Sequence, residues 1–277
     1  MKKNQTERLT KQHKSSGGVE GIFIESAKKH DVSVREVSRA VYESLKIKFP
    51  HLEFRHRSEI TKKEINEKLN QIDSGLGVIL FVEHSRIKPD GGIIEVKDSK
   101  GRWRIVLVSE AKHQGRDIEN ITKGILVGKN NDQDTMVAGN AIERAHKNIN
   151  EIRNVMIDEK HFPYVLFLQG SNFLTAPVIV QRPDGRKVEL RPDDGSLNRL
   201  DRVTASNYSR PINENYCENI FVEVDGEKVM LQTVSLFAKP TPWSAKEMFS
   251  ILMSVARTSL RILGLSRRND IFPRDEA

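Results

Sequence analysis

The sequence predicts an α/β fold, and three observations support this prediction. Short runs rich in β-branched and aromatic residues, typical of strands, occur at 93–96, 103–108 and 164–168. Other stretches carry apolar residues three or four positions apart, which is the spacing of one face of an α-helix. The polar segment 98–101 (Asp-Ser-Lys-Gly) separates the first two strand-like runs, so these two runs are expected to pair as a hairpin.

Length and composition limit the class of protein. At 277 residues the chain can form one large α/β domain with excursions or two small ones. The net charge of +7 and a pI near 9.4 allow attraction to a polyanion such as DNA. With the single cysteine Cys217 no internal disulfide forms, and a reducing cytoplasm is the simplest setting. No apolar run approaches the roughly 18 residues of a membrane helix.

The first third of the chain predicts an arm, two helices and a strand. Residues 1–18 are polar and basic. Two interpretations fit them equally well, a disordered tail and an arm that contacts phosphates. Ser33–Glu36 has the form of a capping box, and Thr61–Glu64 repeats it, so a helix is expected to begin at each. The apolar run Gly77–Val82 predicts a buried strand that leads into the hairpin.

The remaining elements follow from similar patterns. The polar excursion 113–140 precedes a helix that opens at Gly139 and has an apolar side. The run Tyr164–Leu168 predicts a central strand reached through a crossover helix. Asp-Gly pairs predict hairpin turns at 184–185 and 225–226, and a capping box at Ser244–Glu247 predicts the start of a last helix.

Three charged residues mark a candidate catalytic site on the first hairpin. Side chains alternate along a strand, so Glu110 and Lys112 point to the same face. Asp90 precedes the first strand, where the hairpin can return it close to Glu110. Two carboxylates suit Mg²⁺, and a nearby lysine can position a water or offset charge on a phosphoryl transition state.

A purely structural interpretation competes with this hypothesis. Pro-Asp-Gly is a common turn that recurs at 183–185, where no apolar strand ending in Glu-x-Lys follows, and Glu-x-Lys is frequent on solvated surfaces. Glu110 and Lys112, however, end an apolar strand, where unpaired charges are costly and more often functional. Asn140 and Arg144 have side chains that can read purine edges, although an ordinary capped surface helix also fits them. The chain has no Walker loop or Rossmann fingerprint, so no nucleotide cofactor is expected.

Longer segments resemble a known family. They read IKPDGGIIEVKD, VSEAKHQG, DQDTMVAGNAIERAHKN, FPYVLFLQGSNFLT, LNRLDR and NYSRPI. Together they resemble the EcoRI family of type II restriction endonucleases, within the PD-(D/E)xK nuclease superfamily. The resemblance implies a mixed five-stranded central sheet flanked by helices, with arm extensions that embrace DNA. It also implies a flexible basic arm at 1–18 and a single catalytic and DNA-recognition domain at 19–277, with arm insertions near 113–140 and 176–215.

The resemblance also implies an activity and a set of site residues. The expected protein is a homodimer that cleaves both strands of double-stranded DNA at GAATTC with Mg²⁺, leaving 5′-phosphate and 3′-hydroxyl ends. Asp90, Glu110 and the carbonyl of Ala111 match the metal ligands, and Lys112 matches the catalytic lysine. The residues expected to read bases are Gln114, Met136, Val137, Ala138, Gly139, Asn140, Ala141, Glu143 and Arg144. Those expected to contact phosphates or support the arms are Arg86, Lys88, Lys147, Asn148, Arg199 and Arg202.

Two other functions remain open at this point. One is a PD-(D/E)xK nuclease of DNA repair or junction cleavage, and the other is a non-catalytic DNA-binding protein that keeps a degenerate site. Within the base-reading segment, Thr135 and Val137 depart from the family pattern, which leaves the tolerance at the outermost base pair open. Magnesium-dependent cleavage into defined fragments distinguishes the three.

Overall fold

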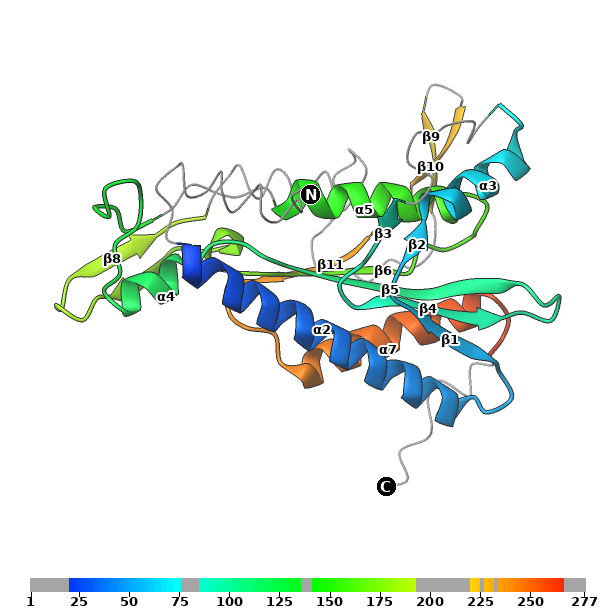
Figure 1. The fold of residues 1–277 in the computed structure, drawn as a ribbon, viewed down its shortest axis with the longest axis horizontal. Coiled ribbons are helices and arrows are strands. Elements are labelled where there is room, and N and C mark those ends of the chain that lie inside the picture. Colours follow the sequence, from blue (N-terminus) through cyan, green and yellow to red (C-terminus); the bar gives the residue numbers. More distant parts are fainter. Residues whose placement is uncertain are drawn as a thin grey trace, which may run out of the picture.

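A five-stranded mixed sheet forms the centre of the computed structural model, in the order β1-β4-β5-β6-β11 (Figure 1). Its strands are β1 (Phe54–Arg57), β4 (Gly92–Lys97), β5 (Trp103–His113), β6 (Tyr164–Gln169) and β11 (Ser235–Lys239). β4 is antiparallel to both β1 and β5, whereas β6 is parallel to both β5 and β11. The predicted mixed five-stranded α/β fold is therefore confirmed. The structure describes residues 20–75, 85–135, 141–192, 220–224, 227–231 and 234–266.

β4 and β5 form the predicted hairpin, which contains a bulge. Ile94 pairs with Leu107, but the next residue, Glu95, pairs with Ile105, so Val106 is an extra residue in β5. Val106 and Leu107 consequently belong to the core on the same face of the sheet. The bulge thus shifts the alternation of the second half of β5 by one residue.

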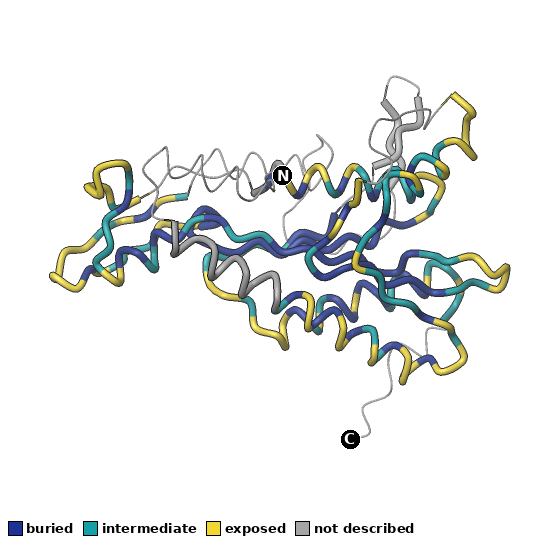
Figure 2. The backbone as a smooth tube through the Cα atoms, viewed as in Figure 1, coloured by how far each residue is buried: buried dark blue, intermediate teal, exposed yellow. Residues whose placement is uncertain are grey.

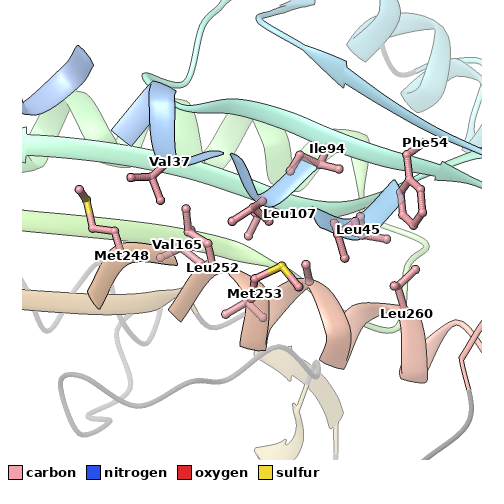
Figure 3. Close-up of a cluster of buried hydrophobic side chains, with 14 of the residues drawn as sticks. Val37, Leu45, Phe54, Ile94, Leu107, Val165, Met248, Leu252, Met253 and Leu260 are labelled. Atoms are coloured by element: carbon pink, nitrogen blue, oxygen red, sulfur yellow. The ribbon is translucent and has the colours of Figure 1, made fainter. Parts of the chain in front are cut away.

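Helices cover both faces of the sheet (Figure 1). α2 (Glu20–Lys48) and α7 (Ala245–Ile262) pack on one face, and α3 (Lys62–Ile72) and α5 (Ala141–Val155) lie on the other. Figure 3 shows the first interface, in which side chains such as Val37 of α2 and Leu252 of α7 meet Leu107 and Val165 of the sheet. In Figure 2 the central strands are accordingly buried, while the outer surfaces of the helices carry the exposed residues.

The crossover from β5 through α5 to β6 was predicted correctly. β6 begins at Tyr164, which pairs in parallel with Val108 of β5. α5 buries Ile142, Ile149 and Ile152, followed by Met156 just past its end, against the sheet, as helical spacing indicated. This arrangement places α5 directly over the half of β5 that carries Glu110.

Two of the three predicted capping boxes begin helices. The Thr61 hydroxyl accepts a hydrogen bond from the backbone N–H of Glu64, and the Glu64 carboxylate accepts one from the backbone N–H of Thr61. Ser244 and Glu247 make the same reciprocal pair of hydrogen bonds. The prediction at Ser33–Glu36 was wrong, because α2 begins at Glu20 and runs through these residues. A capping side chain acts only where the backbone leaves helical geometry, and Ser33–Glu36 lie inside the continuous helix.

A smaller unit lies at one end of the molecule (Figure 1). It contains α4 (Asp117–Thr122), η1 (Ser171–Phe173) and the predicted hairpin of β7 (Val178–Gln181) and β8 (Lys187–Leu190). Ile121, Leu174 and Leu190 form its own buried cluster. The buried guanidinium of Arg182 joins the hairpin to the preceding loop through Asp134 and the carbonyl of Gly124 (2.8 Å).

The remaining described strands form two small antiparallel pairs. β2 (Ile60–Thr61) pairs with β3 (Arg86–Ile87), which leads directly toward Asp90. β9 (Ile220–Val224) pairs with β10 (Glu227–Leu231), as the Asp-Gly turn predicted. The predicted strand at Gly77–Val82 and the arm at 1–18 lie outside the described residues. In the part of the chain that the structure describes, each helix is too short or too polar to span a membrane.

Candidate active site

The turn before β4 holds Asp90 against the middle of β5. The backbone N–H of Gly91 donates to the carbonyl of Ser109 (2.9 Å), and the backbone N–H of Gly92 donates to the carbonyl of Pro89 (3.0 Å). Gly92 has a φ of 82°, which favours glycine. At Gly91 a Cβ atom would lie 2.2 Å from the Ser109 hydroxyl, so the close approach of the turn to β5 requires a residue without a side chain.

This approach brings together the three residues singled out on the hairpin. The Lys112 ammonium lies 2.5 Å from Asp90 Oδ2 and 2.6 Å from Glu110 Oε1, and it donates to the Ala111 carbonyl at 3.2 Å. The backbone N–H of Ala111 also donates to Asp90 Oδ2 (3.3 Å). One ammonium group therefore contacts oxygen atoms of all three groups that the family resemblance assigns to a metal ion.

Glu110 is fully buried, and its two carboxylate oxygens have different partners. Oε1 faces Lys112 and accepts a hydrogen bond from the Asn148 amide of α5 (2.7 Å). Oε2 accepts a hydrogen bond from the hydroxyl of Tyr164 on β6. Burial raises the pKa of Glu110 above its ordinary value, and the Lys112 charge opposes this rise while the Asp90 charge adds to it.

Charge and burial also act on the two donors. Burial alone would lower the pKa of Lys112, but the adjacent Glu110 and Asp90 carboxylates outweigh it and raise that pKa above its ordinary value. The side chain is therefore a cation at neutral pH. Burial, together with the negative charge of Glu110, raises the pKa of Tyr164 well above its ordinary value. The phenol therefore stays protonated, and its O–H donates the hydrogen bond to Glu110.

Two contacts in the site were not expected from the sequence. Tyr164 lies within the apolar run 164–168, where an aromatic residue is expected to belong to the hydrophobic core. His56 of β1 donates from Nε2 to the Gly91 carbonyl (3.0 Å) and stacks on Tyr42 of α2, with 5.9 Å between the ring centroids. His56 thereby links a helix to the turn that carries Asp90, and its position on an edge strand gave no signal of this.

The donor set fits a hard divalent cation. Two carboxylates and a main-chain carbonyl supply oxygen ligands, which Mg²⁺ prefers, and such sites use few protein ligands. The Lys112 ammonium already satisfies the same oxygens with a positive charge. Among the described residues no group of three His, Cys, Asp or Glu side chains comes together, so the fit depends on the carbonyl as third ligand.

The described residues expected to contact DNA fall into exposed and buried sets. Arg86 and Lys88 are exposed and share the Glu59 carboxylate at 2.5 and 2.8 Å. Arg144 and Lys147 are exposed on α5. Asn148 instead contacts Glu110, and Gln114 is buried at the end of β5.

The other expected DNA contacts are not described. Met136, Val137, Ala138, Gly139, Asn140, Arg199 and Arg202 lie outside the described residues. Ala141 and Glu143 belong to the first turn of α5, but nothing is described of their side chains.

Comparison with known proteins gives consistent matches over nearly the whole chain. The family model described as "Restriction endonuclease EcoRI" matches residues 16–270. The chain is 57% identical over 264 residues to the type II restriction enzyme EcoRI of Escherichia coli, covering 95% of each chain. It is 56% identical over 261 residues to the type II restriction enzyme RsrI of Cereibacter sphaeroides, covering 94% of each.

Proposed function

Because this chain belongs to the EcoRI family of type II restriction endonucleases, we propose that it is a homodimer that hydrolyses both strands of double-stranded DNA at GAATTC with Mg²⁺. The observation that supports this proposal is the convergence of Asp90, Glu110 and Lys112 on one point. Two carboxylates, a carbonyl and a lysine at that spacing can hold a divalent cation and stabilise negative charge on a phosphoryl group, as metal-dependent phosphodiester hydrolysis needs.

The proposed ligands of the divalent cation are Asp90, Glu110 and the Ala111 carbonyl. When bound, the cation would polarise the phosphoryl oxygen and lower the pKa of a bound water. Lys112, held as an ammonium by its two carboxylate neighbours, would then stabilise the negative charge that develops on the phosphoryl group. Water would attack the phosphorus in line with the 3′ oxygen, forming a new P–O bond as the bond from phosphorus to the 3′ oxygen breaks. The attacking water loses a proton and the 3′ oxygen gains one, so the products carry a 5′-phosphate and a 3′-hydroxyl.

Specificity is assigned to the entry of α5. The proposed base contacts are Gln114, Met136 to Ala141, Glu143 and Arg144, with Asn140 bonding an adenine edge. Arg86, Lys88, Lys147, Asn148, Arg199 and Arg202 are proposed to contact phosphates or support the arms, which sets register and most of the affinity. A palindromic target matches a two-fold dimer, because each chain then meets one half-site.

The arms are proposed to embrace the DNA. α4 and the β7–β8 hairpin fall within the proposed insertions near 113–140 and 176–215, and together with Leu174 they form a buried cluster of their own at one end of the molecule. The N-terminal segment 1–18 adds a basic arm of the kind that approaches phosphates.

A plasmid digest with and without Mg²⁺ tests the activity. The wild-type chain is expected to give defined fragments that end at GAATTC, only when Mg²⁺ is present. Asp90→Ala should bind the same duplex and leave it intact, because losing a metal ligand need not remove the phosphate contacts. Asp158→Ala serves as a matched control, since this exposed carboxylate pairs with Lys68 away from the site. Cleavage without sequence preference, or nicking that depends on DNA structure, would contradict the proposal.

A further inference from the structure

The two oxygens of the Glu110 carboxylate are unequal, and Tyr164 makes them so. Oε1 faces Lys112 and Asn148, on the side where the proposed metal ligands converge. Oε2 instead accepts a hydrogen bond from the Tyr164 hydroxyl. A carboxylate free to rotate would present either oxygen, whereas a donor fixed on one oxygen leaves the other for the site.

Tyr164 is well suited to act as such a fixed donor. Its backbone is held in the central sheet, where it pairs with Val108 of β5. Its ring is fully buried and stacks on Phe162, with 5.8 Å between the centroids and 21° between the planes. Glu110 lies two residues beyond Val108 on the same strand. The position of the Tyr164 hydroxyl is therefore set by the sheet that carries Glu110 and does not depend on a loop.

We propose that Tyr164 is a positioning residue of the active site, whose hydroxyl holds Glu110 Oε2 and thereby turns Oε1 toward the divalent cation. This inference rests on the proposed function and deepens it. Partners that orient a ligand side chain are worth about 10- to 100-fold in metal affinity or activity. In a simpler interpretation, the hydrogen bond to Glu110 only provides a partner for the buried Tyr164 hydroxyl and contributes to folding. The two interpretations predict different effects of losing the hydroxyl on metal binding.

The test removes only the hydroxyl. Tyr164→Phe and wild-type protein are each bound to a GAATTC duplex with an uncleavable scissile linkage, and Mn²⁺ is titrated by electron paramagnetic resonance. We expect Mn²⁺ to bind about 10- to 100-fold more weakly to the variant. On cleavable duplex, the Mg²⁺ concentration for half-maximal single-turnover cleavage should rise correspondingly. Affinity for the duplex without metal should stay unchanged, because Tyr164 is buried.

Two further variants separate positioning from stability. Ser259→Ala removes another buried hydroxyl, which bonds the Val255 carbonyl within α7, and it should leave Mn²⁺ affinity unchanged. In a Glu110→Ala background, Tyr164→Phe should have no further effect on the residual Mn²⁺ affinity, since Tyr164 acts through that carboxylate.

The outcomes distinguish this inference from the proposed function. Equal Mn²⁺ affinity of wild type and Tyr164→Phe, with wild type cleaving normally, overturns the role of Tyr164 alone. Absence of Mg²⁺-dependent cleavage by the wild type overturns the proposed function itself. A variant that unfolds more easily yet binds Mn²⁺ as wild type does would assign Tyr164 to the fold and overturn the positioning role.

Discussion

At the scale of single residues, the burial of Glu110 governs the site. Removing a carboxylate from water costs several kcal/mol unless other groups replace the lost hydration. Lys112, Asn148 and Tyr164 replace it, each through a direct contact with a carboxylate oxygen. The Lys112 charge and the Tyr164 hydroxyl thereby oppose the rise in the pKa of Glu110 that burial causes.

Gly91 gives a residue-scale prediction, because it sets the distance between Asp90 and β5. Its φ lies outside the left-handed region, so an alanine there meets only a steric problem, the Ser109 hydroxyl 2.2 Å from the new Cβ. We expect Gly91→Ala to displace the turn and slow cleavage by about 100-fold, the size of effect that a 1 Å misplacement can have. Single-turnover cleavage at saturating metal measures it.

A second substitution makes this prediction specific. Ser109→Ala removes the hydroxyl, after which the nearest Ser109 atom is its Cβ, 3.1 Å away. Gly91→Ala with Ser109→Ala should therefore recover much of the lost rate, while Ser109→Ala alone should cut as wild type does. A Gly91→Ala enzyme with an undiminished rate would show that the turn tolerates the contact.

Residue-level reasoning from sequence reached the charged residues but missed two of their partners. Asp90, Glu110 and Lys112 were found because a hairpin returns the first to the other two and because charges at the end of an apolar strand are unusual. Tyr164 was missed because a tyrosine in an apolar run is ordinarily core, and only the tertiary contact with Glu110 distinguishes it. His56 was missed because its partner is a main-chain carbonyl 35 residues away.

At the scale of elements, the bulge in β5 determines which face carries the site. If residues 105–110 alternated strictly, with no bulge, Glu110 would be five positions from Ile105 and would point away from α5. The sequence predicts the strand but not the bulge, since 105–108 is apolar at every position and gives no alternation to interrupt. Likewise, the capping pattern at 33–36 could not reveal that α2 continues through it, because the same four residues also fit inside a longer helix.

His161 gives a prediction at this scale, because it joins the segment before β6 to β5. Its buried ring donates from Nε2 to the Ile105 carbonyl (2.9 Å), and Nδ1 is buried with no hydrogen-bond partner among the described residues. Burial lowers the pKa of His161 below its ordinary value of 6.5, although the Ile105 carbonyl opposes this. The folded protein therefore resists protonating it.

The sign of the pH effect follows from this lowered pKa. Above about pH 6.5 the ring is neutral in both states, so its contribution to stability is fully present. As the pH falls through 6.5 toward the lower folded pKa, the unfolded chain binds a proton first and stability is lost, by up to about 1.4 kcal/mol per pH unit. Urea unfolding between pH 7.5 and 5.5 should show a smaller loss for His161→Gln than for wild type. Parallel curves for the two proteins would contradict the prediction.

At the scale of the whole molecule, the positive charge of the chain and the small end unit bear on how DNA is held. The net charge of +7 favours a polyanion, but Arg86 and Lys88 are each paired with Glu59. Net charge therefore allows a polyanionic partner but does not indicate the surface that binds it. The β7–β8 hairpin of the end unit was predictable from its Asp-Gly turn, whereas the association of β7 and β8 with α4 depends on contacts distant in sequence.

The proposed homodimer gives the last prediction, because each chain carries one set of Asp90, Glu110 and Lys112. Wild-type and Asp90→Ala chains, coexpressed with different affinity tags and purified through both, form dimers with a single competent site. Such dimers should cut one strand at GAATTC, so supercoiled plasmid should become open circles that linearise slowly. The matching dimer with Asp158→Ala in place of Asp90→Ala should give linear DNA directly. If the Asp90→Ala heterodimer made linear DNA as fast, one site would serve both strands, and the two-fold arrangement of active sites would have to be abandoned.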